Sequence, residues 1–506
     1  MLQNINRPFE ALSATTGASA DEIKIIFSFL LSYPLAGLLK RIPDTRPGLK
    51  NLFIICPYMP WIGFVFLMCH MSVNHVRRQT ANDSSSVDIT GAQMVLVMKL
   101  SAFCWNVADG QLQNDRLSEF QKDHALGDLP PVLDFAAYVL FFPALLAGPA
   151  FDYIEYRRWI DTSMFDVPPE IDAAKRPPVR KRRKIPRSGT PATLKALLGL
   201  IWIALFVSLS SRFSPEKLVA QSYLQYGLAR RIWIMYMANL VARFKYYGVW
   251  TLAEGSCILA GLGYNGVDPV TGKVAWNRLR NIDPWAVETA QNPRGYLAGW
   301  NINTNNWLRN YVYLRVTPRG KKPGFRATMT TFVTSALWHG FYPGYYLTFV
   351  LASLIQTVAK NFRRTVRPFF LDPMVEGPGP GKTCYDVIGY IATQFTFSFA
   401  TTPFLLLNMS DSLRAWSGVY FYGLFGTLAC LGFFSSSAKT LLRMRLDERQ
   451  GKAHAKLVRS VSTESLTEKE PILGISKDLE QDMSEAMEEI RAEVQTRQRK
   501  VLHILD

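Results

Sequence analysis

Apolar residues in this chain gather into long runs separated by polar or basic loops. Eight or more runs reach, or nearly reach, the length of about 20 residues that crosses the hydrocarbon core of a bilayer. Because backbone N–H groups in hydrocarbon must find partners within their own segment, these runs predict helices. The runs are 23–39, 51–70, 93–108, 132–150, 193–210, 230–262 (one piece or two), 327–359 (two pieces) and 384–434 (two pieces).

The loops indicate an orientation. Loops 40–50 and 151–192 are rich in Lys and Arg, which favours the cytosolic side for both. An even number of crossings must then separate them, yet three candidate runs lie between. We therefore expect that one run is not a plain crossing. The run 93–108 is the candidate because it is short and contains Lys99, and a re-entrant or in-plane helix would restore the count.

The pattern divides the 506 residues into three parts. Residues 1–22 form a polar N-terminal segment, 23–442 the apolar body and 443–506 a polar tail. From residue 476 onward the tail carries one apolar stripe at helical spacing. The stripe predicts a single amphipathic helix rather than a coiled coil, because Arg497 interrupts it. The predicted fold class is all-α, a polytopic transmembrane helical bundle.

Composition narrows the function classes. The chain is 48% hydrophobic and 19% charged, with a net charge of +17. The averages mix a very apolar body with a very polar tail, and this division excludes a simple soluble enzyme, a disordered protein and a disulfide-stapled secreted module. The basic run 175–187 lies between apolar stretches, so it indicates a loop near anionic headgroups rather than a nucleic-acid arm. Six cysteines without CxxC spacing predict buried thiols and no metal site.

Two stretches carry candidate chemistry. Residues 300–307 (WNINTNNW) hold four asparagines and two tryptophans, too polar for a lipid-facing helix and too aromatic for an ordinary loop. His339 follows an apolar run, and an ionisable group at membrane depth is a functional-site hypothesis by default. The alternative is a structural histidine bound to a backbone carbonyl. Neighbouring Trp, Gly and Pro-Gly residues indicate a helix broken beside a cavity, which favours function.

These residues match a known pattern. The signature WHGxxPGYxxxF of the membrane-bound O-acyltransferases (MBOAT) is matched in full by Trp338-His339-Gly340-x-x-Pro343-Gly344-Tyr345-x-x-x-Phe349. Residues 300–304 resemble the family's asparagine-bearing motif, and Tyr390-x-x-x-x-Phe395 resembles a shorter third motif. The resemblance covers about residues 20–440, and the chain is most similar to the fungal broad-specificity lysophospholipid acyltransferases.

The resemblance implies a bundle of the MBOAT type with a buried tunnel or cavity, in the endoplasmic-reticulum membrane. It implies transfer of a fatty acyl group from acyl-CoA to the hydroxyl of a lysophospholipid, with no cofactor and no nucleic-acid partner. His339 is the expected general base and Asn303 the second catalytic residue, with Asn301 as its competitor. The residues expected to bind substrate are Trp300, Asn301, Trp307, Trp338 and Tyr345.

Two alternatives remain open at this point. An MBOAT enzyme can acylate another acceptor, such as a sterol or diacylglycerol. A membrane transporter would use His339 as a proton relay, and an inverted repeat would favour it. The residues 300–307 and the WHG motif each occur once, so no such repeat is visible. The acceptor headgroup cannot be read from the sequence.

Overall fold

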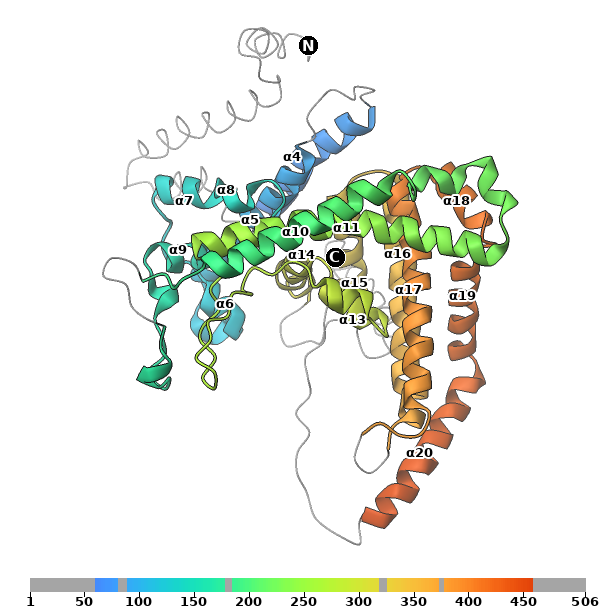
Figure 1. Ribbon diagram of the computed structural model, residues 1–506. Coiled ribbons are helices and arrows are strands. Elements are labelled where there is room, and N and C mark those ends of the chain that lie inside the picture. The colour runs from blue at the N-terminus through green and yellow to red at the C-terminus, as the bar shows by residue number, and fades with distance from the viewer. Residues whose placement is uncertain (1–59, 81–88, 178–183, 318–324, 373–376, 458–506) are drawn as a thin grey trace, which may run out of the picture. The chain divides into compact units, whose positions relative to one another are not determined.

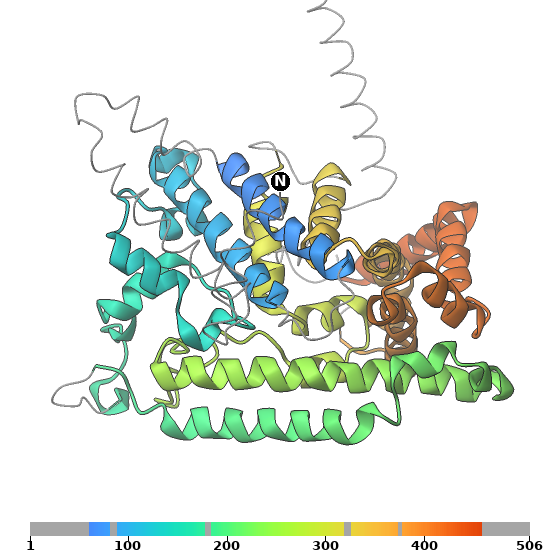
Figure 2. The ribbon, with the colours of Figure 1, turned by 90° about the horizontal axis from the view of Figure 1, so that it is seen from above.

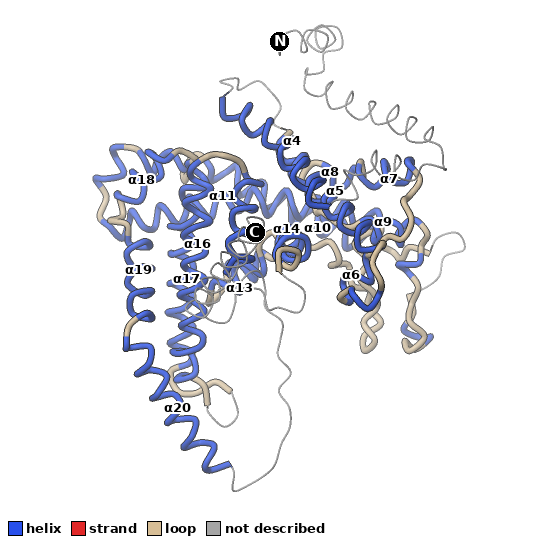
Figure 3. The backbone as a smooth tube through the Cα atoms, turned by 180° about the vertical axis from the view of Figure 1, so that it is seen from behind, coloured by secondary structure: helices blue, strands red, loops and turns tan. Residues whose placement is uncertain are grey.

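The computed structural model describes residues 60–80, 89–177, 184–317, 325–372 and 377–457. Within these residues the regular structure is helical, apart from isolated bridges between Val267 and Val274 and between Leu371 and Pro378 (Figure 3). The predicted all-α class is confirmed for this part of the chain. The predicted helix beyond residue 476 lies outside the described residues, as do the segment 1–22 and the run 23–39.

The chain forms two compact units, Met1–Asp166 and Val167–Asp506, and the division falls inside the range 23–442 predicted as one domain. In the first unit α4 packs along α5, and the Trp61 ring meets Trp105 edge-on at 5.2 Å. The described elements of this unit are α4 (Pro60–Thr80), α5 (Thr90–Gly110), η1 (Asn114–Arg116), α6 (Glu119–His124), α7 (Val132–Val139), α8 (Phe142–Leu145), α9 (Tyr153–Ile160) and η2 (Ser163–Phe165).

We expected the run 93–108 to be too short for a plain membrane crossing, and this expectation was wrong about its length. The run belongs to α5, whose 21 residues are long and apolar enough to cross a membrane. Lys99 does not prevent this, because its Nζ donates hydrogen bonds to the carbonyl oxygens of Tyr138 and Val139 at the end of α7. A helix end leaves such carbonyls without intrahelical partners. The run 132–150 is the one that is broken, into α7 and the four-residue α8.

The second unit contains the longest of the described helices. The last helix that the structure describes, α20, crosses the boundary at 442 where we expected the polar tail to begin. Its elements are η3 (Ala173–Lys175), α10 (Gly189–Ser210), η4 (Pro215–Val219), η5 (Gln221–Gln225), α11 (Leu228–Ala260), α12 (Pro284–Glu288), α13 (Pro293–Gly299), α14 (Ile302–Leu308), the π-helical turn η6 (Arg309–Tyr313), α15 (Phe325–His339), α16 (Pro343–Asn361), η7 (Phe362–Val366), η8 (Arg367–Phe370), α17 (Lys382–Leu406), α18 (Met409–Ser417), α19 (Tyr422–Ser435) and α20 (Ser437–Leu457).

Helices α10 and α11 run side by side (Figures 1 and 2). Two glycines permit the close packing, since a Cβ at Gly199 or at Gly248 would lie 3.1 Å from the carbonyl oxygen of the other. Small residues serve this purpose at membrane helix contacts. An ion pair of 2.8 Å joins Lys195 of α10 to Glu254 of α11. The run 230–262, left open as one piece or two, is a single helix.

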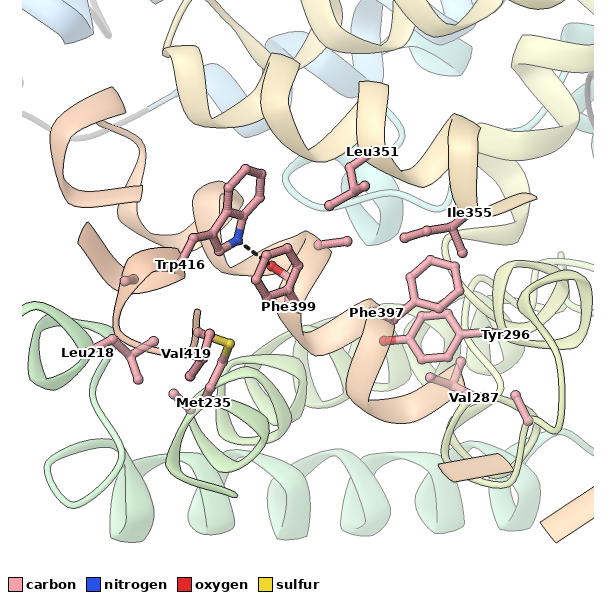
Figure 4. Packing of buried hydrophobic residues seen from close by; sticks show 14 of the residues in the cluster. Leu218, Met235, Val287, Tyr296, Leu351, Ile355, Phe397, Phe399, Trp416 and Val419 are labelled. Atoms are coloured by element: carbon pink, nitrogen blue, oxygen red, sulfur yellow. Dashed lines mark hydrogen bonds between the residues drawn. The ribbon is translucent and has the colours of Figure 1, made fainter. Parts of the chain in front are cut away.

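The core of this unit lies among α11, α16, α17 and α18 (Figure 4). The indole of Trp416 stacks on Phe399 at 4.8 Å and donates its N–H to the Phe399 carbonyl oxygen at 2.9 Å. Tyr296 of α13 stacks on Phe397 at 4.3 Å with nearly parallel rings. These contacts fix α13, and the chain that follows it, against α17.

Among the residues that the structure describes, fewer helices qualify as membrane spans than the apolar runs predicted for the whole chain. In the described part of the chain α5 and the stretch Gly189–Val219 are long and apolar enough, and the pair α18 and α19, bent by 80°, adds a third if it forms one span. The described residues therefore do not reach the expected eight or more, and the run 23–39 and the start of the run 51–70 lie outside them. Helix α15 is only 15 residues long, and α11 contains buried charged residues such as Arg243.

Candidate active site

His339 is the last residue of α15, at a sharp break in the chain. The next residue, Gly340, has φ +122°, a backbone conformation that favours glycine. Pro343 then begins α16, where its fixed φ suits the first turn of a helix. The predicted helix break beside His339 is therefore present. His339 therefore lies at the end of one helix, close to the start of the next, and not in the middle of a continuous helix.

Aromatic rings surround the half-buried imidazole of His339. Phe349 of α16 stacks against it at 5.2 Å with the ring planes inclined by 29°, and Phe404 of α17 meets it edge-on at 5.0 Å. Trp338 and Tyr345, both named from the sequence, lie at 4.8 Å and 5.7 Å. Phe404 was missed by sequence reasoning. It follows Pro403 in an apolar helix and has no pattern that marks it.

Gly344 explains how α17 comes so close to His339. Its backbone N–H donates to the carbonyl oxygen of Leu407 at 2.7 Å, beyond the end of α17. A Cβ at position 344 would lie 2.0 Å from the carbonyl oxygen of Pro403, so only glycine fits. The contact holds the first turn of α16 against the last turn of α17 and brings Phe404 to the imidazole.

The asparagine-rich stretch 300–307 begins in the turn between α13 and α14 and continues through α14, and its side-chain amides hold the turn together. Asn301 has φ +45°, in the left-handed region that asparagine tolerates, and its Oδ1 accepts a hydrogen bond from the Thr304 hydroxyl at 2.8 Å. The amide nitrogen of Asn305 donates to the carbonyl oxygens of Leu297 and Trp300. Much of the polarity of this stretch therefore serves the turn itself.

Asn303 lies in the first turn of α14 and is held by a residue that sequence reasoning missed. Its backbone N–H donates to Oδ1 of Asn281 at 3.0 Å. Its amide nitrogen donates to the same oxygen at 3.3 Å and to the carbonyl oxygen of Arg280 at 3.4 Å. Asn281 is buried, with 4% of its surface exposed, and precedes α12. A lone asparagine in a loop carries no motif that would single it out.

Trp307 connects the two halves of the site. It lies four residues after Asn303, on the same face of α14. Its ring lies 6.1 Å from that of Trp338, the neighbour of His339. Trp300 makes its ring contacts with α11, at 5.3 Å from Trp250 and 6.1 Å from Tyr247. The structure therefore brings Trp307, Trp338 and Tyr345 into the surroundings of His339, whereas Trp300 anchors the turn to α11.

A partly buried charged pair supports this arrangement. Arg243 of α11 makes two hydrogen bonds to the carboxylate of Glu288, at 2.7 Å and 2.8 Å, and the Tyr247 hydroxyl donates to the same carboxylate at 2.6 Å. Paired guanidinium and carboxylate groups of this geometry are strong and directional. They fasten α12 to α11, and α12 is followed by α13 and then by α14, which contains Asn303.

Comparison with known proteins assigns the class. The family model of the membrane-bound O-acyltransferases matches residues 78–402, so this chain belongs to that family, whose members are integral membrane proteins. The chain is 42% identical to the "Lysophospholipid acyltransferase" of Schizosaccharomyces pombe over 497 residues, which cover 90% of this chain and 96% of the relative.

Two further relatives extend the comparison. The "Lysophospholipid acyltransferase" of Saccharomyces cerevisiae is 41% identical over 450 residues, or 80% of this chain and 72% of the relative. The "Lysophospholipid acyltransferase 1" of Arabidopsis thaliana is 30% identical over 370 residues, or 72% of this chain and 75% of the relative. The resemblance expected from the WHG signature is thereby confirmed.

Proposed function

We propose that this enzyme transfers a fatty acyl group from acyl-CoA to the free hydroxyl of a lysophospholipid. The names of its similar relatives support the acceptor class. The observation that carries the proposal is the placement of His339, a half-exposed imidazole at the break between α15 and α16 within the family signature.

In the proposed mechanism His339 acts as general base. The thioester of acyl-CoA is already activated, whereas the acceptor alcohol must lose its proton as it attacks. A neutral imidazole suits this task and contributes about 10²–10⁴ in rate. The alcohol oxygen forms the new ester bond to the acyl carbon as its proton passes to His339, and the carbon–sulfur bond breaks. The imidazolium then returns the proton to the thiolate, so CoA leaves as the thiol. Transfer is direct within a ternary complex and uses no metal or other cofactor.

Asn303 assists this step, and the aromatic side chains of Trp307, Trp338 and Tyr345 contact the acyl chain or the acceptor. Both substrates are amphiphiles, so they meet in a tunnel open to the cytosol and to a leaflet of the endoplasmic-reticulum membrane. The basic segment 315–326, of which residues 318–324 lie outside the described part, attracts the CoA phosphates by its charge.

The test is His339→Ala in membranes supplied with labelled acyl-CoA and a panel of acceptors. The panel contains lysophospholipids with different headgroups, a diacylglycerol and a sterol. We expect wild-type activity on lysophospholipids and a loss of at least about 10²-fold in His339→Ala, with near-normal expression and membrane insertion. The matched control is His70→Ala, which changes an exposed histidine of α4.

Two outcomes would contradict the proposal. More than a tenth of wild-type turnover in His339→Ala would remove the general-base role. Transfer to the sterol or the diacylglycerol in preference to every lysophospholipid would leave the family assignment intact and replace the acceptor.

A further inference from the structure

We propose that Asn281 is a positioning residue that fixes the side-chain amide of Asn303, so that Asn303 faces the reaction with its oxygen and acts as a hydrogen-bond acceptor. This inference rests on the proposed function, in which Asn303 belongs to the catalytic site. The Asn303 amide could have one of two roles in catalysis. Its oxygen could hold a proton-bearing group in place, or its NH₂ group could polarise the thioester carbonyl.

The orientation of the Asn281 amide follows from the main chain. The backbone N–H of Asn303 points at the end of the Asn281 side chain at 3.0 Å. A backbone N–H only donates, so the atom it meets must be the amide oxygen and not the amide nitrogen. The backbone N–H of Ile302 also donates to the Asn281 carbonyl oxygen, at 2.8 Å. Two consecutive N–H groups at the start of α14 therefore bind the same residue.

The orientation of the Asn303 amide follows in turn. One end of this side chain faces two acceptors, Oδ1 of Asn281 at 3.3 Å and the carbonyl oxygen of Arg280 at 3.4 Å. Only the NH₂ group is compatible with two acceptors, so the oxygen must occupy the other end. Turning the amide over would place its oxygen against the oxygens of Asn281 and Arg280, which is repulsive, and would remove both of the hydrogen bonds that the NH₂ group donates.

The orientation of the Asn303 amide determines which hydrogen bonds it can make to the reacting groups. A thioester carbonyl that gains negative charge needs a donor, and the NH₂ group of Asn303 is already engaged by Arg280 and Asn281. The oxygen of Asn303 accepts a hydrogen bond instead, from the ring N–H of His339 or from the hydroxyl of the acceptor lipid. Either contact orients the proton transfer, so the loss of orientation lowers kcat rather than substrate binding.

The experiment compares Asn281→Leu with Asn281→Asp. Leucine removes the acceptor, and kcat should fall by about 10–100-fold, the range in which the loss of a group that orients a metal ligand lowers activity. KM for acyl-CoA and for the lysophospholipid should stay within twofold. Aspartate keeps an oxygen in place for both N–H groups of Asn303 and should restore at least a third of the activity. If Asn281→Leu does not accumulate in membranes, Asn281→Ser, which is too short to reach, should show the same loss of kcat.

The matched control is Asn277→Leu. Asn277 Oδ1 accepts a hydrogen bond from the Asn265 amide at 3.0 Å, but this pair lies in an exposed loop. The variant should retain wild-type kinetics.

A double variant tests whether Asn281 acts through Asn303. Asn281→Leu combined with Asn303→Ala should be no slower than Asn303→Ala alone, because the amide to be oriented is absent. If the double variant is slower than Asn303→Ala by the full factor that Asn281→Leu causes alone, the two residues act independently and the inference is wrong. It is also wrong if Asn281→Leu has the wild-type kcat while Asn303→Ala is impaired. Neither result contradicts the proposed function. Wild-type activity in Asn303→Ala would instead remove Asn303 from the catalytic site, and the inference with it.

Discussion

Gly344→Ala probes the contact that brings α17 to His339. The added Cβ would lie 2.0 Å from the Pro403 carbonyl oxygen and 2.8 Å from that of Leu407. An ordinary carbon–oxygen contact needs about 3.3 Å, so the start of α16 must move by more than about 1 Å from the end of α17. Overpacking of this kind costs about 1–3 kcal/mol, and loss of the 2.7 Å hydrogen bond from Gly344 to Leu407 adds about 1 kcal/mol.

The catalytic effect should exceed the loss of stability. The same movement shifts Phe404 and Tyr345 relative to the imidazole, and a misplacement of about 1 Å at a catalytic group lowers the rate by about 10²-fold. The assays are thermal unfolding of the detergent-solubilised protein and acyl transfer to a lysophospholipid. We expect a clear fall in the unfolding temperature and a fall of about 10²-fold in turnover.

Gly432→Ala is the matched control, because a Cβ at this glycine of α19 meets no atom within 4 Å. It should unfold at or above the wild-type temperature, since alanine favours a helix over glycine. If Gly344→Ala unfolds at the same temperature as this control and retains more than half of the activity, the close approach of α16 to α17 does not position Phe404 and Tyr345 for catalysis.

Three further predictions follow from the site and its support. Asn303→Ala should cost more activity than Asn301→Ala in one lysophospholipid assay, because the Asn301 oxygen is already bound within the turn; the reverse order would place the catalytic amide two residues upstream. Replacing all six cysteines should leave substantial activity, because direct transfer needs no thiol nucleophile, and a hydroxylamine-sensitive acyl adduct on the protein would refute this. Arg243→Leu should lower the free energy of unfolding by about 3 kcal/mol, because it leaves the Glu288 carboxylate without its cation, whereas Arg230→Leu at the exposed start of α11 should change it little.

The family signature could be read from the sequence because it lies in consecutive residues with strong local preferences. Gly340 adopts a positive φ and Pro343 begins a helix, so the break at His339 is encoded where it occurs. The apolar runs predicted helices for the same reason, since periodicity and hydropathy are properties of neighbouring residues.

The count of membrane crossings was less predictable. Hydropathy and charge predicted an irregular run at Lys99. The Lys99 ammonium group, however, donates hydrogen bonds to carbonyl oxygens at the end of another helix, and α5 is continuous. The run that is broken is 132–150, which forms α7 and α8. Whether a charged residue interrupts a helix depends on the partner it meets. That partner lies about 40 residues away in the chain and is invisible to a local pattern.

What the sequence determined by itself was the helical class, the family and the position of His339, because each depends on residues that are adjacent in the chain. Only the tertiary structure decided what surrounds that histidine and how Asn303 is turned. Phe404 reaches the imidazole through a glycine contact between α16 and α17, and Asn281 reaches Asn303 across 22 residues. Hydrogen bonds and ring contacts between distant segments form only when the chain is folded, and no single segment carries the signal for them.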